Sequence, residues 1–339
     1  MRVTIADVAR EAGTSVSTVS RAFTAPELLR DETRGHVLAV AERLGYRPNR
    51  AARGLVTGRT GNLGVIVPDL GNPFFPAILK GVQSRAREAD YAVFLADSDE
   101  DPAEEPPLVQ AMAKQVDGVI LCASRMSPAQ LDRVAAQTSL VLVNRRFRDH
   151  PAVTMDVAGA MRQGIDHLAA LGHRRIAYVG GPRTSWSNRE RRRGLRHAAR
   201  YGVEITEFGP FAPIFDSGPH GADLAVAAGV TAVIAYNDLM SLGVMSRLAA
   251  RGLAVPGDIS VLGFDDIPMA GMATPPLTTV AMQNEKVGRA AVDLLTTLLR
   301  VSGAGSGDRR RELDCQLIVR GSTAGPPNAT ERGTPNAEE

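Results

Sequence analysis

The sequence is poor in several residue types and lacks the long apolar runs that mark some common protein classes. Its 339 residues include 2 Cys and 1 Trp, and aromatic residues make up 4%. Cys122 and Cys315 are too few for a disulfide framework and lie in strand-like runs, so we expect buried free thiols, as in a reducing cytoplasm. No apolar run approaches the roughly eighteen residues that span a bilayer, and the polar N-terminus lacks a signal-peptide pattern. We therefore expect a cytoplasmic chain without a membrane anchor.

Motifs of common catalytic sites are missing as well. We find no GxxxxGK[ST] loop, no GxSxG elbow, no HExxH pair and no full GxGxxG after a strand. His167 and His173 have the wrong spacing for one metal-binding helix face, and Cys122 has no neighbouring Cys or His. We therefore expect no metal, no cofactor and no enzyme activity. The rival hypothesis is a sugar- or nucleoside-processing enzyme on an α/β scaffold.

Positive charge is concentrated at the start of the chain. Residues 1–60 contain ten Arg and no Lys against six Asp and Glu, whereas the remainder has 29 basic and 31 acidic residues. The formal net charge of +2 hides this asymmetry. A basic N-terminal segment suits contact with a phosphate backbone.

Residues 3–23, VTIADVAREAGTSVSTVSRAF, predict two helices joined by a tight turn. The apolar stripe of the first helix is Ile5, Val8, Ala9 and Ala12. Gly13 suits the turn because glycine readily adopts a positive φ, and the hydroxyl of Ser15 is placed to cap the second helix at the Thr18 N–H. That helix should bury Val19 and Phe23. It should expose Ser17, Thr18, Ser20 and Arg21, a surface that suits the major groove of DNA.

A third helix is predicted over residues 31–44, followed by a short basic segment. Its buried face should contain Val37, Leu38, Ala41 and Leu44, and Gly45 ends it. In the segment 45–60, Pro48 and Asn49 can start a helix of about two turns, which is too short to hold alone in water. Leu55 among arginines suits an apolar wedge in the minor groove. A flexible linker explains the same composition equally well.

From residue 61 the pattern changes to apolar strands that alternate with helix-sized segments. The predicted strands are 64–68, 92–97, 118–122, 140–144, 175–181, 232–238 and 259–266. The clearest helices are 76–89, 159–172 and 239–252. Such alternation is typical of an α/β fold with doubly wound parallel sheets, and about 260 residues of it favour two lobes.

Polar and aromatic side chains gather where these strands end. Parallel sheets bind ligands beyond the carboxyl ends of their strands. The candidate residues there are Asp69, Asn72, Phe74, Phe75, Asn144, Arg145, Arg146, Asn237, Asp238, Asp265 and Asp266. Carboxylates, amides and arginines beside an aromatic pair suit a polyol or a similar small polar molecule. Loops between strands and helices are polar in any case and supply N-caps, a role open to Asp238, so each residue also has a structural interpretation.

Over essentially its whole length the chain resembles transcriptional regulators of the lactose-repressor/galactose-repressor (LacI/GalR) family. The resemblance rests on IADVAREAGTSVSTVSRAF near the start, on GYRPNRAARGLVTGRT over 45–60 and on RGS at 320–322. It implies an all-α helix-turn-helix domain over 1–46 and a hinge helix or linker over 47–60. A two-lobed, periplasmic-binding-protein-like domain for effector binding and dimerisation would follow over 61–323, crossed three times by the chain, with a disordered tail over 324–339.

The implied function is sequence-specific DNA binding by a repressor whose operator affinity responds to a small, sugar-like effector. Two identical heads in a homodimer imply a palindromic operator. A secreted sugar-binding protein would share the cleft, but it would need a signal peptide and no DNA-binding head.

The resemblance also implies which residues contact DNA. Val16 and Ser17 fall on the positions that most determine specificity, Arg21 on a base or phosphate contact, and Ala52 and Leu55 on the minor-groove hinge. The implied contacts are Thr4, Ser15, Val16, Ser17, Thr18, Arg21, Asn49, Ala52 and Leu55.

For the effector, Arg191 matches the arginine that usually clamps it, and Ser187 a nearby contact. The implied contacts are Asp69, Asn72, Phe74, Phe75, Asn144, Trp186, Ser187, Arg191, Asn237, Asp265 and Gln283. Trp186 would stack on the ligand or cap the cleft. Structural roles are expected for Asp238 and Asp266, and a solvated helix face for Arg189, Arg192 and Arg193.

The chain departs from the family pattern in four places. Asn144 stands where many relatives have Asp, so one charged hydrogen bond would be absent and the preferred ligand altered. Val157 replaces the asparagine that often follows Asp156. The acidic, proline-broken stretch 99–110 predicts a shortened helix, and the proline-rich tail 325–339 predicts disorder.

Overall fold

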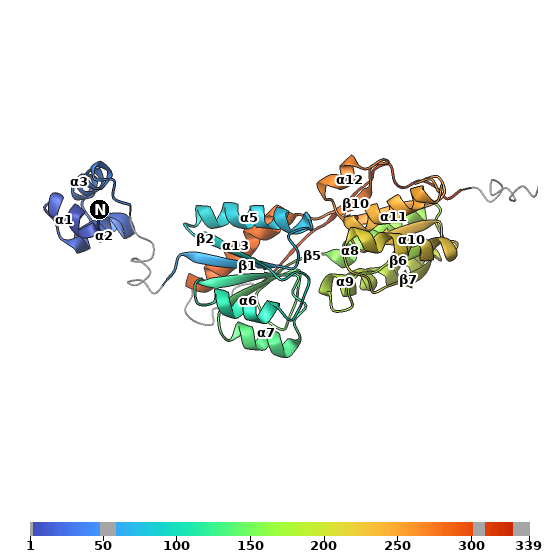
Figure 1. Ribbon diagram of the computed structural model, residues 1–339, viewed down its shortest axis with the longest axis horizontal. Coiled ribbons are helices and arrows are strands. Elements are labelled where there is room, and N and C mark those ends of the chain that lie inside the picture. The colour runs from blue at the N-terminus through green and yellow to red at the C-terminus, as the bar shows by residue number, and fades with distance from the viewer. Residues whose placement is uncertain (1–2, 48–58, 301–308, 328–339) are drawn as a thin grey trace, which may run out of the picture. The chain divides into compact units, whose positions relative to one another are not determined.

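The computed structural model describes residues 3–47, 59–300 and 309–327 (Figure 1). The chain divides into two compact units, Met1–Gly61 and Asn62–Glu339. The first unit contains α1 (Ile5–Glu11), α2 (Val16–Thr24), the 3-10 turn η1 (Pro26–Leu28) and α3 (Asp31–Arg43). The second contains two six-stranded sheets with their helices.

Local capping sets the helix starts in the first unit. The Thr4 hydroxyl accepts a hydrogen bond from the Asp7 N–H, and the Asp7 carboxylate accepts one from the Thr4 N–H at 3.0 Å. Before α2, Ser15 Oγ accepts a hydrogen bond from the Thr18 N–H at 3.1 Å, which confirms the predicted cap. Gly13 has a φ of 62° in the turn between the helices, the conformation that favours glycine.

The three helices enclose a small apolar core. Its buried members are Val8, Ala9, Ala12, Val19, Ala22, Val37, Val40 and Ala41. The prediction for α3 was wrong in part, because Leu38 and Leu44 are only half-buried and Val40 is buried instead. Val37, Val40 and Ala41 share one helix face at spacings of three and four residues.

The first lobe of the second unit is a wholly parallel sheet with the strand order β11-β5-β4-β3-β1-β2. Its strands are β1 (Asn62–Val67), β2 (Ala92–Asp97), β3 (Gly118–Cys122), β4 (Ser139–Val143), β5 (Ala152–Met155) and β11 (Arg310–Leu313). Its helices are α5 (Phe74–Glu88), α6 (Glu105–Met112), α7 (Pro128–Ala135) and α13 (Asn284–Arg300).

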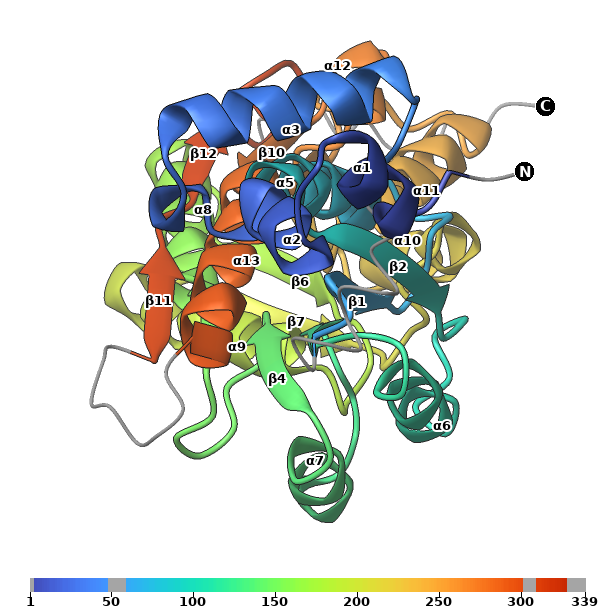
Figure 2. The same ribbon diagram turned by 90° about the vertical axis from the view of Figure 1, so that its left-hand side faces the viewer.

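Alternation along the strands divides the core of this lobe between two faces. Val65 belongs to the apolar cluster that contains Ile78 of α5 and Val287 of α13. Ile66, the next residue of β1, belongs to the cluster that contains Leu131 of α7. Figures 1 and 2 both show α5 and α13 on one side of the sheet and α6 and α7 on the other.

The second lobe has the strand order β12-β10-β9-β8-β6-β7, in which β12 pairs antiparallel and the other pairs are parallel. Its strands are β6 (Arg175–Val179), β7 (Glu204–Phe208), β8 (Ala232–Ala235), β9 (Ser260–Asp265), β10 (Thr278–Ala281) and β12 (Gln316–Ile318). Its helical segments are α8 (Val157–Ala170), α9 (Trp186–Leu195), η2 (Arg196–Tyr201), η3 (Phe215–Ser217), α10 (Gly218–Ala227), α11 (Asp238–Ala250) and α12 (Pro268–Met272).

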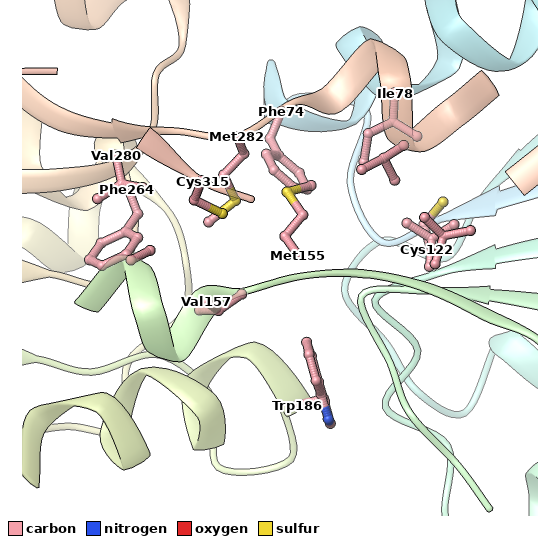
Figure 3. Close-up of a cluster of buried hydrophobic side chains, with 14 of the residues drawn as sticks. Phe74, Ile78, Cys122, Met155, Val157, Trp186, Phe264, Val280, Met282 and Cys315 are labelled. Atoms are coloured by element: carbon pink, nitrogen blue, oxygen red, sulfur yellow. The ribbon is translucent and has the colours of Figure 1, made fainter. Parts of the chain in front are cut away.

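The chain passes between the two lobes three times, as the resemblance implied. The passages lead from β5 to α8, from β10 to α13 and from β11 to β12. One apolar cluster includes side chains from both lobes, among them Phe74, Met155, Phe264 and Met282 (Figure 3). The predicted α/β fold with two doubly wound lobes is therefore confirmed.

All seven predicted strands are present, and the bounds of β2 and β3 are those predicted. Five strands were missed, namely β5, β7, β10, β11 and β12. Three of them lie at sheet edges, where a strand needs no continuous apolar run. The predicted strand β2 is also an edge strand, and its Phe94 and Leu95 are 40% and 38% exposed.

Other local predictions have mixed outcomes. Helix α6 begins at Glu105, the last acidic residue of the stretch 99–110, and is 8 residues long. Helix α8 begins at Val157, with Asp156 accepting a hydrogen bond from the Gly159 N–H at 2.8 Å. Cys122 and Cys315 are free and buried, as predicted, and burial raises the pKa of each thiol to about 12. Residues 328–339 of the predicted tail lie outside the described residues.

None of the helices described in residues 3–47, 59–300 and 309–327 is long and apolar enough to span a bilayer.

Candidate functional site

Helix α2 presents a polar face with one apolar residue at its start. Val16 is 47% exposed, and Ser17 and Arg21 are exposed. Arg21 forms no ion pair with the described residues, so its guanidinium is available to a partner molecule. Thr18 is half-buried and shares a hydrogen bond with Ser15, 2.9 Å between their hydroxyl oxygens.

Two of the proposed DNA contacts, Thr4 and Ser15, have capping roles in the head itself. Each hydroxyl holds the first turn of a helix, so each residue positions a helix whether or not it touches DNA. Asn49, Ala52 and Leu55 lie outside the described residues, and their roles stay predictions.

A cleft in the second unit is lined by residues from both lobes. Its unfilled volume, including the part open to solvent, is about 490 Å³. The lining residues are Pro68, Asn72, Phe74, Phe75, Glu100, Ala123, Arg125, Asn144, Ser185, Ser187, Arg191, Pro213, Tyr236, Asn237, Asp265 and Met282. Most of them follow β1, β3, β4, β8 and β9, at the carboxyl ends where parallel sheets bind ligands.

Arg191 is the most buried cation of the cleft, with 3% of the residue exposed. Its guanidinium carbon lies 4.3 Å from the ring centre of Tyr236 and 4.6 Å from that of Phe264. Arg191 Nη2 lies 3.6 Å from Asp265 Oδ1, so the two charges attract but do not form a short hydrogen bond. Arg191 Nε is buried and has no hydrogen-bond partner, which leaves a donor available to a ligand.

Asp265 faces this arginine from the end of β9. Burial raises the pKa of its carboxyl to about 7, and the positive charge of Arg191 opposes that rise. The carboxyl therefore exchanges a proton near neutral pH. The backbone φ of Asp265 is 115°, a conformation that is uncommon outside functional sites.

Asn144 follows β4 and supplies a neutral acceptor. It is 4% exposed, and its Oδ1 atom is buried without a hydrogen-bond partner. Its φ of 52° lies in the left-handed region, where Asn is more common than most residues. An unpaired buried amide oxygen is costly unless a ligand donates to it.

A second cation, Arg125, follows β3 in a loop organised by Glu105. The Glu105 carboxylate accepts a hydrogen bond from the Arg125 N–H at 2.9 Å and another from Ser124 Oγ. Burial raises the pKa of Glu105. The guanidinium of Arg125 forms an ion pair with Glu100, and both residues also line a larger outer space of about 1000 Å³ that opens beyond the cleft.

The structure brings eight of the eleven predicted effector residues together in the cleft, namely Asn72, Phe74, Phe75, Asn144, Ser187, Arg191, Asn237 and Asp265. Two of the eight also have structural hydrogen bonds. Asn72 Oδ1 accepts from the Phe74 N–H at 3.1 Å. Asn237 caps α11 through the Met240 N–H at 3.0 Å, so the N-cap role considered for Asp238 belongs to Asn237.

Three predicted residues lie elsewhere. Asp69 lines the outer space rather than the cleft. Trp186 is a member of the apolar cluster that joins the lobes and is 8% exposed, so it packs in the core (Figure 3). Gln283 donates to the Asp314 carbonyl at 2.8 Å and accepts from Lys286 at 2.7 Å. Neither Trp186 nor Gln283 lines the cleft in the described structure.

The predicted structural residues take the roles expected of them. Asp238 is buried and accepts hydrogen bonds from Thr279 at 2.6 Å and from the Ile267 N–H at 3.0 Å. Asp266 pairs with Arg320 at 2.6 Å. The exposed arginines of α9 are Arg189, Arg192 and Arg193, as predicted.

Four polar residues of the lining were not predicted, namely Glu100, Arg125, Ser185 and Tyr236. Tyr236 lies at the carboxyl end of the predicted strand 232–238, and Arg125 comes three residues after the predicted strand 118–122. The rule that found Asn144 and Asn237 would therefore have found them as well. Glu100 lies in the acidic stretch and has a φ of 59°, which no sequence pattern indicated.

No group of three or more His, Cys, Asp or Glu side chains that could hold a metal occurs in the described parts of the chain.

Comparisons with known proteins match both units. The model for bacterial regulatory proteins of the lacI family matches residues 4–49, and that for a periplasmic binding protein-like domain matches residues 165–323. The chain is 32% identical over 335 residues to the HTH-type transcriptional repressor CytR of Escherichia coli (strain K12), which covers 96% of this chain and 97% of that protein.

Solved structures agree. The lac repressor dimer bound to operator and the anti-inducer ONPF has a TM-score of 0.82 and 28% identity, covering 96% of this chain and 100% of that chain. The complex of the transcriptional regulator CelR with cellobiose has a TM-score of 0.69 and 32% identity, covering 95% of this chain and 100% of that chain.

Proposed function

The chain belongs to the LacI family of bacterial transcriptional regulators. We propose that its head reads a palindromic operator and that a small polar effector in the cleft changes the affinity for that operator. The chain is a DNA-binding regulator of transcription. Repression, a sugar-like effector, a homodimer and a cytoplasmic location complete the proposal. The observation that carries it is the pairing, in one chain, of an exposed helix α2 with a cleft that holds unpaired buried polar atoms.

In the head, α2 is the element that enters the major groove. Val16 and Ser17 lie in its first turn, where a recognition helix contacts base edges. The exposed methyl groups of Val16 suit the methyl group of thymine, and Arg21 suits guanine or a phosphate. Leu55 is proposed as the wedge that opens a base step in the minor groove.

Arg21→Ala and Leu55→Ala should therefore change operator binding in different ways. Loss of the Arg21 charge should weaken binding by about 1–3 kcal/mol and lower the slope of log affinity against log salt by about one, because one phosphate or base contact disappears. Leu55→Ala changes no charge, so the slope should stay the same while DNA bending is lost. Fluorescence anisotropy over a salt series and a gel bending assay measure both. Equal salt slopes in parent and Arg21→Ala would refute the contact, and normal bending by Leu55→Ala would refute the wedge.

The cleft is proposed to bind its effector without turnover. Among the described lining residues there is no His, Lys or Cys. Ser185 already caps α9 and hydrogen-bonds with Tyr236 at 3.0 Å, and neither its hydroxyl nor that of Ser187 is hydrogen-bonded to a carboxylate of the described residues. An activated nucleophile with a neighbouring base is therefore lacking from these residues. The groups that remain, Arg191, Asp265 and Asn144, suit hydrogen bonds to hydroxyl or carboxylate oxygens.

Effector binding changes operator affinity only if the effector prefers one arrangement of the two lobes. The cleft meets this condition because its polar atoms come from both lobes, with Asn144 and Arg125 in the first and Arg191 and Asp265 in the second. A ligand that touches both sides stabilises the arrangement in which both sets of contacts form.

The homodimer is proposed to use the exposed edge of the first lobe. Phe94 and Leu95 on the edge strand β2 are 40% and 38% exposed, and no strand of the described residues pairs with the outer edge of β2. The second lobe exposes Phe215, Leu224 and Met272. Exposed apolar groups of this kind mark surfaces that a partner covers.

A double substitution, Phe94→Lys with Leu95→Lys, should raise the dimer dissociation constant about 100-fold. The loss corresponds to about 3 kcal/mol from burial of two apolar side chains. Sedimentation velocity measures the change. Leu70→Lys is the matched control, because Leu70 is 39% exposed in the same lobe but lies outside β2. A double variant that stays dimeric at the parent's concentration would place the interface elsewhere.

Operator selection tests the function as a whole. Duplex DNA selected from a random pool by the full-length protein should contain an inverted repeat, since a two-fold dimer presents two identical heads. Sugars and related metabolites are then screened by thermal shift, because a ligand of the folded state raises the melting temperature. A hit should change operator affinity and should be recovered chemically unchanged. Chemical conversion of the hit would favour the enzyme, and selected DNA without any shared sequence would refute the regulator.

A further inference from the structure

The guanidinium of Arg191 lies against two aromatic rings. Tyr236 stacks on it at 4.3 Å and Phe264 at 4.6 Å. The Tyr236 hydroxyl hydrogen-bonds with Ser185 at 3.0 Å, which fixes the ring in place. Gly181 makes room for this ring, because a Cβ atom there would lie 2.6 Å from Tyr236. A guanidinium held in this way can donate only in its own plane, as a carboxylate requires for two parallel hydrogen bonds.

Within the described structure Arg191 has no full counter-charge. It forms no hydrogen bond to any described residue, and its Nε is buried without a partner. Asp265 lies 3.6 Å from it, beyond hydrogen-bond distance. Burial raises the pKa of Asp265 to about 7, so near neutral pH this carboxyl is partly protonated and compensates Arg191 only in part.

The groups around Asp265 do not add negative charge to the cleft. Asp238 is buried behind it, and burial and the nearby Asp265 raise the pKa of Asp238 well above its usual value. Burial also raises the pKa of the Cys315 thiol to about 12, so that thiol is neutral. The other carboxylate of the lining, Glu100, is already paired with Arg125.

On the opposite lobe, Asn144 contributes an amide rather than a carboxylate. Its Oδ1 is buried and has no hydrogen-bond partner, so it needs a donor from the ligand. A hydroxyl group supplies that donor, whereas a carboxylate does not.

We propose that the effector is a sugar acid or a similar polyhydroxy acid: its carboxylate binds in the plane of Arg191, and a hydroxyl group donates to Asn144. The inference rests on the proposed effector role of the cleft and specifies the ligand class. Tyr236 acts as a positioning residue, because it holds the guanidinium in the orientation that a planar anion needs.

Because Asp265 titrates near neutral pH, the affinity for a sugar acid should change with pH in the opposite sense to the affinity for a neutral sugar. A bound carboxylate is repelled by ionised Asp265, so it binds the form in which Asp265 is protonated. With a pKa of about 7, raising the pH from about 6 to about 8 lowers the protonated fraction roughly tenfold, and the affinity for the acid should fall by that factor. A neutral sugar that donates hydroxyl hydrogen bonds to Asp265 prefers the ionised form, so its affinity should rise over the same range.

The experiment is isothermal titration of the full-length protein at about pH 6 and pH 8 with matched probes. The pairs are D-gluconate with sorbitol, D-glucuronate with D-glucose, and D-galacturonate with D-galactose, and glucose 6-phosphate is added as a different anion. All three carboxylates stay ionised over this range because sugar acids titrate far below it. At least one acid should bind at least tenfold tighter than its neutral partner, and its affinity should fall with pH.

Three variants separate the contributions of the residues. Asp265→Asn should abolish the pH dependence, so that the acid's affinity at pH 8 stays near its pH 6 value. Asn is the chosen replacement because it tolerates a positive φ. Arg191→Lys keeps the charge but loses the planar pair of donors, so the acid should bind at least tenfold more weakly. Arg193→Ala, an exposed arginine of the same helix, removes one positive charge outside the cleft and should leave acid binding as in the parent.

Several results would overturn the proposal. One is that the neutral partner binds more tightly than every acid, and another is that the affinity for the acid rises with pH. The others are that glucose 6-phosphate binds more tightly than every carboxylate, and that protein which still binds its operator binds none of the acids. A neutral sugar that shifts operator affinity would overturn this inference but leave the proposed regulator intact. Operator binding that no cleft ligand changes would instead refute the effector role itself.

Discussion

In operator titrations, Arg191→Ala should lose the response to effector altogether. The parent's operator affinity should change about five- to 150-fold on addition of effector, the usual range for a coupling of 1–3 kcal/mol, and the variant's ratio should fall to about one. Arg191 is 3% exposed and supplies the unpaired donor of the cleft. Its removal also leaves Asp265 without the positive charge that opposes the rise in its pKa, so both partners of the site are lost together.

Three measurements make this result interpretable. Effector affinity of the variant is measured by calorimetry, and ligand-free operator affinity is measured alongside, so that damage to the head is distinguished from loss of the effector site. Arg193→Ala is the matched control, because it removes the same charge from the exposed face of α9. If Arg191→Ala responds to effector as the parent does, the cleft described here is not the effector site.

The largest expected loss of stability comes from the crossing of α5 and α13. A Cβ atom at Gly81 would lie 2.0 Å from the Glu285 carbonyl oxygen, and one at Gly288 would lie 2.2 Å from the Ile78 carbonyl oxygen. Both contacts are with backbone, which cannot rotate away as a side chain can. The two helices are therefore in contact through their glycines.

Gly81→Ala should lower the free energy of unfolding of the second unit by about 1–3 kcal/mol, the usual cost of overpacking, although alanine favours a helix by about 1 kcal/mol. Thermal unfolding should show a drop of roughly 2–4 °C per kcal/mol. Gly271→Ala is the control, because Gly271 lies in helix α12 with no atom within 4 Å of the added Cβ and should cause no loss. Equal melting temperatures for Gly81→Ala and the parent would mean that the helices separate at no cost.

The features that the sequence predicts correctly are those whose signal is local. The caps at Thr4 and Ser15 and the turn at Gly13 involve groups within three residues of one another, so their effects are readable in the sequence. The apolar runs of β3 and β9 are likewise local, because central parallel strands bury both faces and must be apolar throughout. The edge strands β7 and β11 were missed because several of their side chains are polar and exposed, so they contain no apolar run.

The candidate site was predictable only in part. The rule that ligands bind at the carboxyl ends of parallel strands located Asn144, Asn237 and Asp265 in the cleft. It could not exclude Trp186, which was expected to stack on the ligand or cap the cleft. Trp186 precedes Ser187 in α9, and one residue along a helix turns the side chain by about 100°, here toward the core. The rule also could not find Glu100, which reaches the cleft through a loop with a positive φ.

The sequence by itself determined that the chain has a helix-turn-helix head, a two-lobed α/β core and polar residues at the strand ends. These properties depend on helix period, capping and apolar runs, which act between residues close along the chain. Only the tertiary structure decided that Arg191 lies over the rings of Tyr236 and Phe264, that Asp265 stays 3.6 Å away, and that Asn144 has an unpaired oxygen. Those contacts join strands and helices of two sheets, and burial there sets both the pKa of Asp265 and the cost of every unpaired polar atom.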